Sequence, residues 1–439
     1  MKANLFGTDG IRSLAGAYPL DESSLLRLGA IIADQAPVPR VLIGRDTRES
    51  GPAIEALLGR GLGRRTRVFS AGVLPTPGLA YLTHAHGFGL GVMISASHNP
   101  FADNGIKLFD RHGEKASAAL EARISRVFLA GKRNPAGKPS LPQTMDAAAY
   151  ENFLRIEGKE LAGTDWQLAA DCANGAASRL APALFQLLGL RVAAAHFAPD
   201  GRNINAGCGS TFPSALQELV ASSRANLGLA FDGDADRVVF ADAHGRVIEG
   251  DHVLFHVARL LRRTEPRFKP VVVGTVMSNL GLERALRRAG IDFLRADVGD
   301  KHVYRLMKRS GAILGGEPSG HVILRHRQST GDGLLTALYF MRALRYFHCD
   351  AAAARDQLIL FPQQTLSIRV RRRPLLEAWE AFQRESARFA RTQGTRARLL
   401  ARYSGTEPKL RIMIEARDPE IIDRHMPVFQ RLVENEIGE

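Results

Sequence analysis

A serine in a tight turn is the first residue of this sequence that could do chemistry. Ser97 lies in the segment Ser95–Pro100, which directly follows the apolar run Leu90–Ile94. The asparagine and proline that end the segment favour a turn, and the backbone amides of such a turn can face an anion. A hydrolase elbow would need the pattern Gly-x-Ser-x-Gly, whereas alanine and histidine flank this serine. We therefore expect Ser97 to accept a phosphoryl group, with a structural turn serine as the alternative.

Three carboxylates at alternate positions form the second candidate. Asp232, Asp234 and Asp236 follow the apolar run Leu227–Phe231. On an irregular loop, side chains with this spacing can converge on one hard cation, and so dense a group of like charges is costly without a neutralising partner. A calcium loop of the EF-hand type would need glycine and glutamate at its sixth and twelfth positions, where arginine and alanine stand. The pattern favours Mg²⁺, which completes its shell with phosphate oxygens, over a solvated acidic turn.

A glycine-framed loop, Gly315–His321, contains Glu317, Ser319 and His321. These side chains offer acceptors and donors for sugar hydroxyls, and a histidine can also transfer a proton near neutral pH. The pattern indicates a sugar-binding loop, with a merely solvated loop as the alternative.

A segment near the carboxyl end is rich in groups that bind phosphate. Two guanidiniums, two hydroxyls and a turn glycine occur within ten residues, at Arg402, Ser404, Gly405, Thr406 and Arg411. A guanidinium matches phosphate geometry with paired hydrogen bonds, which an ammonium group cannot do. We expect a phosphate cradle here, with a polar β-turn as the alternative.

Two further cations complete the set. Arg12 follows a glycine-rich start, and Lys107 stands ten residues beyond Ser97. Either could stabilise a phosphoryl group in transfer. Nucleotide binding has little support, because the sequence contains no Walker A motif and its glycine patterns lack the Gly-x-Gly-x-x-Gly spacing.

The elements that must position these residues alternate between short apolar runs and helical stretches, which is typical of α/β proteins with largely parallel sheets. In such folds the turns after strand ends carry function. The expected strands are Arg40–Gly44, Leu90–Ile94, Gln167–Asp171, Leu227–Phe231 and Pro270–Val276. The expected helices are Pro52–Arg64, Ser178–Leu188, Asp251–Arg262, Leu280–Ala289 and Asp332–Leu344, with another over Asp146–Ile156 after a linker at Gly131–Pro142. Beyond Pro362, alternation over Gln364–Arg371 and a strand over Lys409–Glu415 indicate a small α+β unit.

Composition narrows the class of protein. With 439 residues, the chain exceeds the about 250–300 residues that a single core holds, so several domains are expected. The net charge of +14 comes from arginines spread along the chain without interleaved aromatic residues, which disfavours nucleic-acid binding. Cys172, Cys208 and Cys349 form no Cys-x-x-Cys pair, which argues against a disulfide framework and against a structural zinc site. The sequence shows no signal peptide and no membrane span, so we expect a cytoplasmic protein.

Taken together, these segments resemble the α-D-phosphohexomutase superfamily, in order, from Phe6 to Arg411. Blocks more specific to its phosphoglucosamine mutase branch are Phe6–Arg12, Gly91–Phe109, Asp171–Ala176, Asn203–Thr211 and Gln328–Gly333. The resemblance implies an α/β fold of four domains around a central cleft, three similar α/β domains plus a small C-terminal α+β domain. We expect these domains at residues 1–150, 151–247, 248–362 and 363–439, which carry the phosphoserine, metal, sugar and phosphate segments in turn.

The resemblance also implies a role for each candidate. The catalytic group would be Ser97, Arg12, Lys107, Arg237 and His321. The ligands of Mg²⁺ would be Ser97, through its phosphate, with Asp232, Asp234 and Asp236. The sugar would be bound by Glu317, Ser319 and His321, and the phosphate that is not reacting by Arg402, Ser404, Gly405, Thr406 and Arg411.

The implied activity interconverts glucosamine 6-phosphate and glucosamine 1-phosphate through phosphoserine and a 1,6-bisphosphate, towards UDP-N-acetylglucosamine and cell-wall precursors. The implied activator is a hexose 1,6-bisphosphate, of glucosamine or of glucose. The expected partner is the phosphosugar substrate, with no nucleic acid and no membrane, and a homodimer is left open.

Three positions depart from the branch. Pro318 replaces a glutamine in the sugar loop, Phe212 replaces a histidine after Cys-Gly-Ser-Thr, and Ser13 stands where a glycine is common. These changes spare the phosphoserine and metal residues but bear on the amino-sugar preference, because Pro318 removes an amide side chain and a backbone donor. A phosphomannomutase/phosphoglucomutase of the same superfamily is therefore the nearest alternative. A nucleic-acid-binding protein and a catalytically retired regulator are the other two.

Overall fold

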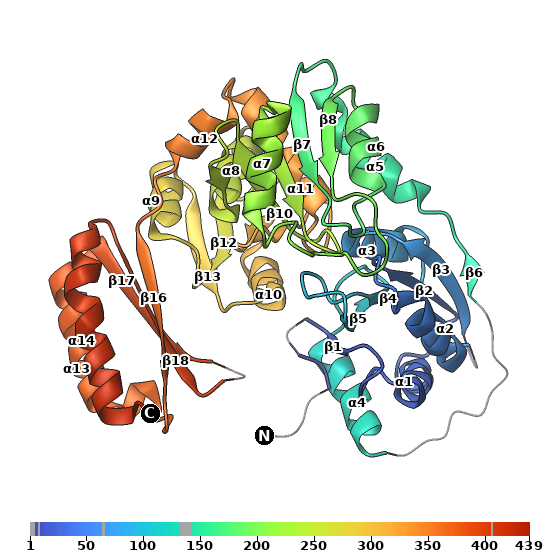
Figure 1. Cartoon of the computed structure of the whole chain (residues 1–439), viewed down its shortest axis with the longest axis horizontal. Coiled ribbons are helices and arrows are strands. Elements are labelled where there is room, and N and C mark those ends of the chain that lie inside the picture. The colour runs from blue at the N-terminus through green and yellow to red at the C-terminus, as the bar shows by residue number, and fades with distance from the viewer. Residues whose placement is uncertain (1–4, 8, 64–65, 132–141, 405–406) are drawn as a thin grey trace. The chain divides into compact units, whose positions relative to one another are not determined.

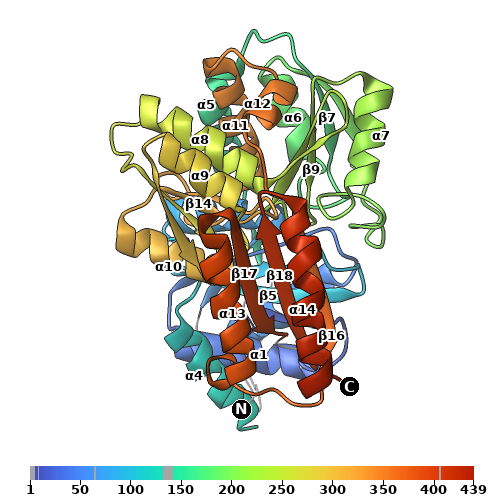
Figure 2. The ribbon, with the colours of Figure 1, turned by 90° about the vertical axis from the view of Figure 1, so that its left-hand side faces the viewer.

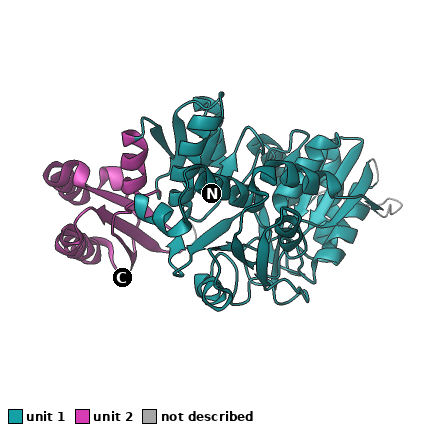
Figure 3. Ribbon diagram, turned by 90° about the horizontal axis from the view of Figure 1, so that it is seen from above, with its two compact units in different colours: residues 1–277, 289–357 teal, residues 278–288, 358–439 magenta. Residues whose placement is uncertain are grey.

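The structure is a computed structural model that describes residues 5–7, 9–63, 66–131, 142–404 and 407–439 (Figure 1). The predicted linker Gly131–Pro142 lies almost wholly outside the described residues. The chain forms two compact units, one of residues 1–277 with 289–357 and one of residues 278–288 with 358–439 (Figure 3). No helix in the described part of the chain combines the length and apolarity needed to cross a bilayer.

The first sheet of the larger unit has six strands. Their spatial order is β1 (Ile11–Leu14), β5 (Asp103–Asp110), β4 (Leu90–Ile94), β2 (Arg40–Arg45), β3 (Arg67–Val73) and β6 (Gln143–Thr144). Strand β2 runs parallel to β3 and β4, whereas β5 is antiparallel to β4 and β1. The helices in this part of the chain are α1 (Glu22–Gln35), α2 (Gly51–Leu62), α3 (Thr76–Ala85) and α4 (Ala118–Leu129). They are followed by α5 (Ala148–Gly158) and the 3₁₀ turn η1 (Lys159–Leu161). Apolar faces of α1, α2 and α4 share one core with the strands.

The second and third sheets of this unit are smaller. The second has the order β11 (Val247–Ile248), β10 (Val238–Asp242), β9 (Leu227–Phe231), β7 (Gln167–Asp171) and β8 (Arg191–Ala195), with α6 (Leu180–Leu187) and α7 (Pro213–Ser223). The third has the order β13 (Asp292–Ala296), β12 (Val271–Thr275), β14 (Leu314–Gly316) and β15 (Val322–Leu324). Its helices are α8 (Gly250–Thr264), α10 (Asp300–Ser310), α11 (Gly333–Tyr346) and α12 (Ala351–Gln357).

The three sheets repeat one topology. Of the four strands that make up the repeat in each sheet, the one that comes first in the chain (β2, β7 or β12) lies between the second and the third and runs parallel to both. The fourth strand pairs with the third in the antiparallel direction. The spatial orders are therefore β3-β2-β4-β5, β8-β7-β9-β10 and β13-β12-β14-β15. The turn between the third and fourth strand of the repeat contains Ser97 in the first sheet, Asp232–Asp236 in the second and Glu317 in the third. Three of the four predicted functional segments therefore occupy equivalent positions of a repeated fold.

The smaller unit is a three-stranded antiparallel sheet covered by helices. The strand order is β16 (Gln363–Arg369), β18 (Lys409–Ala416) and β17 (Ala397–Tyr403). Helices α13 (Glu380–Gln393) and α14 (Pro419–Ile437) lie along this sheet (Figure 2), and their apolar residues form its core. The unit also contains α9 (Leu280–Arg288) and the 3₁₀ turns η2 (Leu376–Ala378) and η3 (Gly394–Arg396).

The predicted α/β class, with three α/β sheets and a small C-terminal α+β part, is confirmed. The strands predicted at Leu90–Ile94, Gln167–Asp171 and Leu227–Phe231 have those bounds. Helix ends differ by one or two residues; α6, for example, begins at Leu180 because a turn over Cys172–Ser178 precedes it. The proposed domain boundaries stay predictions.

Candidate active site

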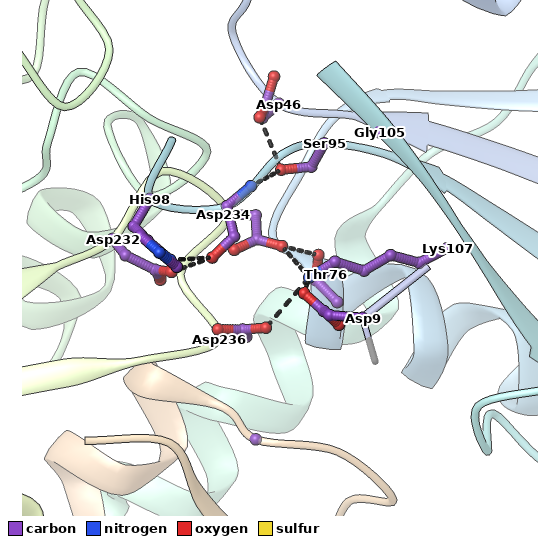
Figure 4. Close-up of polar contacts among 12 residues, drawn as sticks. Asp9, Asp46, Thr76, Ser95, His98, Gly105, Lys107, Asp232, Asp234 and Asp236 are labelled. Atoms are coloured by element: carbon purple, nitrogen blue, oxygen red, sulfur yellow. Dashed lines mark hydrogen bonds and ion pairs between the residues drawn. The ribbon is translucent and has the colours of Figure 1, made fainter. Parts of the chain in front are cut away.

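The turn of Ser97 is held in an unusual backbone conformation. Ser97 has a φ of 54°, in the left-handed region that non-glycine residues rarely adopt and that clusters at functional sites. Its backbone N–H donates to Ser95 Oγ at 2.9 Å, and Ser95 Oγ donates to Asp46 Oδ2 at 2.7 Å (Figure 4). The Ser97 side chain is fully buried, and its Oγ donates to Asp232 Oδ2 at 2.6 Å. The serine loop and the carboxylate loop therefore meet, as the family resemblance implies.

A buried arginine braces this turn from beneath. Arg48 is 1% exposed, and its guanidinium donates to the carbonyl oxygens of Ser97 at 2.9 Å, Asn99 at 2.8 Å and Asp103 at 3.0 Å. It also forms an ion pair with Asp46 at 2.9 Å. The backbone of the serine loop is thus fixed by one charged group.

The two loops approach so closely that only glycine fits between the first two aspartates. A Cβ placed on Gly233 would lie 2.6 Å from the Ser97 carbonyl oxygen. The loop continues through Ala235, which has a left-handed φ of 54°. The resulting turn directs the alternate carboxylates of Asp232, Asp234 and Asp236 to one place, where one oxygen of each lies within 4.8 Å of the others.

Two oxygens of this trio are buried without a hydrogen-bond partner in the described structure, Asp234 Oδ1 and Asp236 Oδ1. The other oxygen of Asp234 accepts from Thr76 Oγ1 at 2.5 Å and from Lys107 Nζ at 2.8 Å (Figure 4). A buried carboxylate oxygen without a donor is costly, and a cation would satisfy both orphaned atoms. Three convergent oxygen ligands fit a hard divalent cation such as Mg²⁺.

The pKa shifts of Asp232 and Asp236 also favour a bound cation. Burial, together with the charges of Asp236 and Asp234, raises the pKa of Asp232 well above its usual range. Burial acts in the same direction on Asp236, but the cations of Lys107 and His321 outweigh it and lower the pKa of Asp236 well below its usual range. A divalent cation held by the three carboxylates would oppose the rise in the pKa of Asp232, because it favours the ionised form of its ligands.

His98 lies next to the hydroxyl of Ser97, and Arg237 lies next to His98. The Arg237 backbone N–H donates to Asp232 Oδ1 at 3.2 Å, and its guanidinium lies 3.1 Å from His98 Nδ1. The same ring nitrogen is 3.4 Å from Ser97 Oγ. Burial and the nearby Arg237 lower the pKa of His98 to about 4, so this ring is neutral at physiological pH.

Six residues of alternating charge form a closed ring beside the trio. Lys107 contacts Asp236 at 3.3 Å and Asp9 at 3.1 Å, and Asp9 contacts Lys115 at 2.5 Å. The ring closes through an ion pair of Lys115 with Asp300 and through His321, whose nitrogens lie 3.6 Å from Asp300 and 3.5 Å from Asp236. Against the effect of burial, Asp234 and Asp9 hold the pKa of Lys107 well above its usual range. Lys107 is therefore a fixed positive charge rather than a base.

His321 has one defined proton position in its neutral form. The Gly331 backbone N–H donates to His321 Nε2 at 3.1 Å, which leaves the proton of the neutral ring on Nδ1, facing Asp236. Against the effect of burial, the carboxylates of Asp236 and Asp300 raise the pKa of His321. Proton exchange near neutral pH is thus compatible with its surroundings.

The loop of Glu317 follows β14 as predicted. Its backbone N–H donates to the His321 carbonyl at 3.0 Å, which folds the loop back on itself, and its Oε1 accepts from the Gly299 N–H at 2.9 Å. The Pro318 carbonyl accepts from the Gly250 N–H at 3.0 Å, and the Ser319 side chain is exposed. Pro318 thus contributes a backbone hydrogen bond through its carbonyl, although it has no N–H to donate.

The structure brings together most of the predicted catalytic residues. Arg12 joins them indirectly, because its guanidinium donates to Asp9 at 2.5 Å and to Asn99 Oδ1 at 3.2 Å. Asp9, Lys115 and Asp300 were not singled out in the sequence, nor were Arg48 and Thr76. Their only sequence signal is proximity to glycine-rich turns, which is too common to identify them.

The smaller unit carries the predicted phosphate cradle. Arg402 and Arg411 are directly opposite each other on β17 and β18. Like charges in this position destabilise a strand pair, and an anion bound between them would remove that cost. The Ser404 backbone N–H donates to the Lys409 carbonyl at 2.8 Å, and Glu407 lies 3.7 Å from Arg411. Gly405 and Thr406 lie outside the described residues.

Sequence models of known families match the chain from end to end. The four models describe the phosphoglucomutase/phosphomannomutase α/β/α domains I, II and III and the C-terminal domain, and they match residues 3–134, 145–245, 249–358 and 367–429. The chain belongs to the phosphoglucomutase/phosphomannomutase family. Its membership confirms the resemblance that the motifs suggested, and it confirms four domains of the predicted kinds.

Curated relatives within this family are similar over the whole length. A phosphoglucosamine mutase of Solibacter usitatus is 42% identical, with all of both chains covered. A phosphoglucosamine mutase of Thermus thermophilus is 45% identical, with 94% of both chains covered.

Solved structures of low sequence identity share the family fold. A phosphoglucomutase/phosphomannomutase family protein of Burkholderia thailandensis has a TM-score of 0.82 at 22% identity, with 99% of both chains covered. Aspergillus fumigatus N-acetylphosphoglucosamine mutase, solved in complex with GlcNAc-6P and magnesium, has a TM-score of 0.66 at 18% identity, covering 97% of this chain and 95% of that one.

Proposed function

We propose that this family member is a phosphoglucosamine mutase that interconverts glucosamine 6-phosphate and glucosamine 1-phosphate. Relatives that bear this name are 40–45% identical over nearly the whole chain. The observation that carries the chemistry is the 2.6 Å hydrogen bond from Ser97 Oγ to Asp232 in a fully buried setting. It joins a serine to a carboxylate trio, the two components that phosphoryl transfer through a metal-assisted phosphoserine needs.

Ser97 would carry the phosphoryl group between the two positions of the sugar. In the first half-reaction the bond from phosphorus to Ser97 Oγ breaks, a bond from phosphorus to O1 forms, and the O1 proton ends on Oγ. The sugar, now a 1,6-bisphosphate, turns around in the site. In the second half-reaction the 6-phosphoryl group returns to Oγ, and the Oγ proton ends on O6. Burial of Ser97 supports this scheme, because exposed phosphoserine would be open to water.

Asp232, Asp234 and Asp236 would hold Mg²⁺, together with the phosphate on Ser97. When bound, Mg²⁺ supplies positive charge to the moving phosphoryl group and to the serine oxygen. Lys107 and Arg237, both permanently charged, would stabilise the same group from two further sides. Arg12 and His321 would complete the catalytic set, with His321 able to hold a proton at Nδ1.

Substrate recognition would be divided between two segments. Glu317, Ser319 and His321 would bind sugar hydroxyls or the amino group. Arg402, Ser404, Gly405, Thr406 and Arg411 would bind the phosphate that is not reacting, since two opposed guanidiniums offer paired donors to phosphate oxygens. A hexose 1,6-bisphosphate would prime Ser97, and the cytoplasm would be the site of action. A homodimer is left open.

The nearest alternative is a phosphomannomutase/phosphoglucomutase with the same catalytic residues. The departure at Pro318 bears on this alternative, because it removes an amide side chain and a backbone donor from the sugar loop. Phe212 is less informative, because it is the N-cap residue of α7 and its side chain is 49% exposed.

A coupled assay with purified protein separates the two. With Mg²⁺ and a trace of glucose 1,6-bisphosphate, kcat/KM is measured for glucosamine 6-phosphate, mannose 6-phosphate and glucose 6-phosphate. We expect glucosamine 6-phosphate to be preferred by about tenfold or more, the effect of one well-placed polar contact. A preference for either plain hexose would reassign the substrate while leaving the catalytic scheme in place.

A further inference from the structure

A second group of metal-ligating side chains lies outside the active site, at the carboxyl ends of two neighbouring parallel strands. Asp171 is the last residue of β7, and His196 directly follows β8, which pairs with β7 in the register Asp171 to Ala195. Cys208 comes from the loop that precedes α7. An oxygen, a ring nitrogen and the sulfur of these three side chains lie within 4.8 Å of one another.

The spacing of His196 and Asp171 resembles that of two ligands of one ion. His196 Nδ1 is 3.1 Å from Asp171 Oδ1, yet this buried nitrogen makes no hydrogen bond among the described residues. Ligands of a tetrahedral zinc ion stand roughly 3.2–3.7 Å apart, because the metal lies about 2.0–2.3 Å from each of them. The Cys208 sulfur lies within 4.8 Å of a ligand atom of each of these two residues and would be the third ligand of such a site.

The Asp171 carboxylate is already oriented for this purpose. Its Oδ1 accepts from the Ala173 N–H at 2.9 Å and its Oδ2 from the Gly209 N–H at 2.8 Å. Each carboxylate oxygen has a second lone pair, so both remain able to bind a cation. Hydrogen bonds of this kind commonly orient the ligands of a metal.

We propose that Asp171, His196 and Cys208 form a binding site for a zinc-class divalent cation. Sulfur and imidazole nitrogen favour Zn²⁺ or Co²⁺, whereas the oxygen trio of the active site favours Mg²⁺. The His196 side chain is 36% exposed, which leaves room for water as the fourth ligand. The thiol proton passes to solvent when the sulfur binds the metal.

From the sequence alone, the lack of a Cys-x-x-Cys pair argued against a structural zinc site. That pattern, however, detects only ligands that are close together in the chain. Here folding assembles three ligands from separate segments. The proposal does not depend on the mutase activity, since none of the three residues belongs to the catalytic group.

The site would fasten a segment that supports both catalytic loops. Asn205, three residues before Cys208, donates through Nδ2 to the Ser97 carbonyl at 2.9 Å. The Ser210 N–H, two residues after Cys208, donates to the Phe231 carbonyl at 2.8 Å, directly before the carboxylate loop. A cation at Cys208 would therefore stiffen the support of the serine and carboxylate loops.

Cobalt titration of the full-length protein tests this proposal. Chelator-treated protein, in excess Mg²⁺ to occupy the oxygen trio, is titrated with Co²⁺ and followed by near-ultraviolet and visible absorption. We expect one equivalent of Co²⁺ to produce a thiolate-to-cobalt charge-transfer band that Zn²⁺ removes. The band should disappear in Cys208→Ser, and His196→Ala should weaken Co²⁺ binding by about tenfold or more.

Two controls make the outcome specific. Cys349→Ser removes a half-buried cysteine far along the chain and should leave the band unchanged. Asp234→Asn impairs the oxygen trio and should also leave it unchanged. If Cys208→Ser fails to fold, the partly exposed His196 provides the second variant. Either the lack of a charge-transfer band or a band retained in both site variants would overturn the proposal.

Discussion

The guanidinium of Arg48 donates a 2.9 Å hydrogen bond to the carbonyl oxygen of Ser97, across 49 residues of sequence. The same guanidinium bonds to the carbonyls of Asn99 and Asp103 and pairs with Asp46, and both charged side chains are fully buried. The strained φ of Ser97 is therefore supported by a buried charge from outside the loop, in addition to the hydrogen bond from its own N–H to Ser95 Oγ.

Replacement of Arg48 by methionine should lower both stability and activity. It leaves a buried carboxylate and several carbonyl oxygens without donors, and breaking a buried ion pair costs about 3–5 kcal/mol. Urea unfolding should report that loss, and kcat should fall more than KM changes because the serine is displaced. Arg202→Met, which breaks an exposed ion pair with Glu49, is the control and should change neither. An Arg48→Met protein with normal kcat would show that the brace is dispensable.

Ser97→Ala should abolish turnover while leaving the fold intact. The variant loses the only atom proposed to carry the phosphoryl group, so the rate should fall by about a thousandfold or more. Intact-protein mass spectrometry after incubation with glucose 1,6-bisphosphate should show one added phosphoryl group in the native protein and none in the variant. Ser95→Ala, which removes the hydrogen bonds to the Ser97 N–H and to Asp46 but keeps the Ser97 hydroxyl, should still accept the label. Near-normal turnover of Ser97→Ala would refute the carrier role.

Asp234→Asn should reduce kcat by orders of magnitude in the presence of Mg²⁺. The change removes a charge from the oxygen trio and disturbs the ion pair with Lys107, which lies 2.8 Å away. Higher substrate concentrations should not restore the rate, because the defect lies in the charge around the moving group. Asp356→Asn, at an exposed ion pair with Arg246, serves as the control. Removal of Mg²⁺ from the native protein by a chelator should reproduce the loss, and re-addition should reverse it.

The sequence predicts the loops of the active site well because each follows an apolar strand. Leu90–Ile94 and Leu227–Phe231 are fully buried runs with turn residues after them, and such a pattern is local. That Ser97 and Asp232 would meet could be inferred only from the family resemblance. The hydrogen bond between them depends on the packing of two sheets, for which the sequence contains no local signal.

The residues that sequence reasoning missed act over long distances. Arg48 contacts carbonyl oxygens about fifty residues away, and Lys115 is paired with Asp300. Neither pair shows helical or strand spacing, so no periodic pattern could indicate it. The three similar α/β domains were implied by the family resemblance alone, because the sequences of the three sheets show no repeat that the eye detects.

Arg411→Ala should weaken substrate binding without destabilising the smaller unit. Loss of charge-assisted hydrogen bonds to phosphate, worth about 1.5–3 kcal/mol, should raise KM by about tenfold to a hundredfold. Stability should be unchanged or slightly higher, because the substitution removes the repulsion with Arg402 directly opposite. Thermal unfolding and steady-state kinetics provide the two measurements. Arg391→Ala, on α13, is a matched control, and an unchanged KM in Arg411→Ala would count against the phosphate cradle.

Acid should destabilise the protein through histidines that are buried in the neutral form, and His256 is the best defined of them. It lies in α8 with no exposed surface, and its Nε2 is 2.8 Å from the Ala354 carbonyl. Burial lowers its pKa to about 4, whereas the unfolded chain has the ordinary value of about 6.5. The unfolded state therefore binds the proton first.

The stability that His256 contributes is complete above about pH 6.5 and is lost as the pH falls towards 4, with a slope of at most about 1.4 kcal/mol per pH unit. His256→Gln keeps a donor for the Ala354 carbonyl but cannot titrate in this range. The difference between the free energies of unfolding at about pH 7.5 and about pH 5 should thus be smaller in His256→Gln than in the native protein. His86→Gln, at an exposed site, should keep the native difference. Equal pH dependence in native protein and His256→Gln would mean that other groups, such as the buried His252, account for the acid sensitivity.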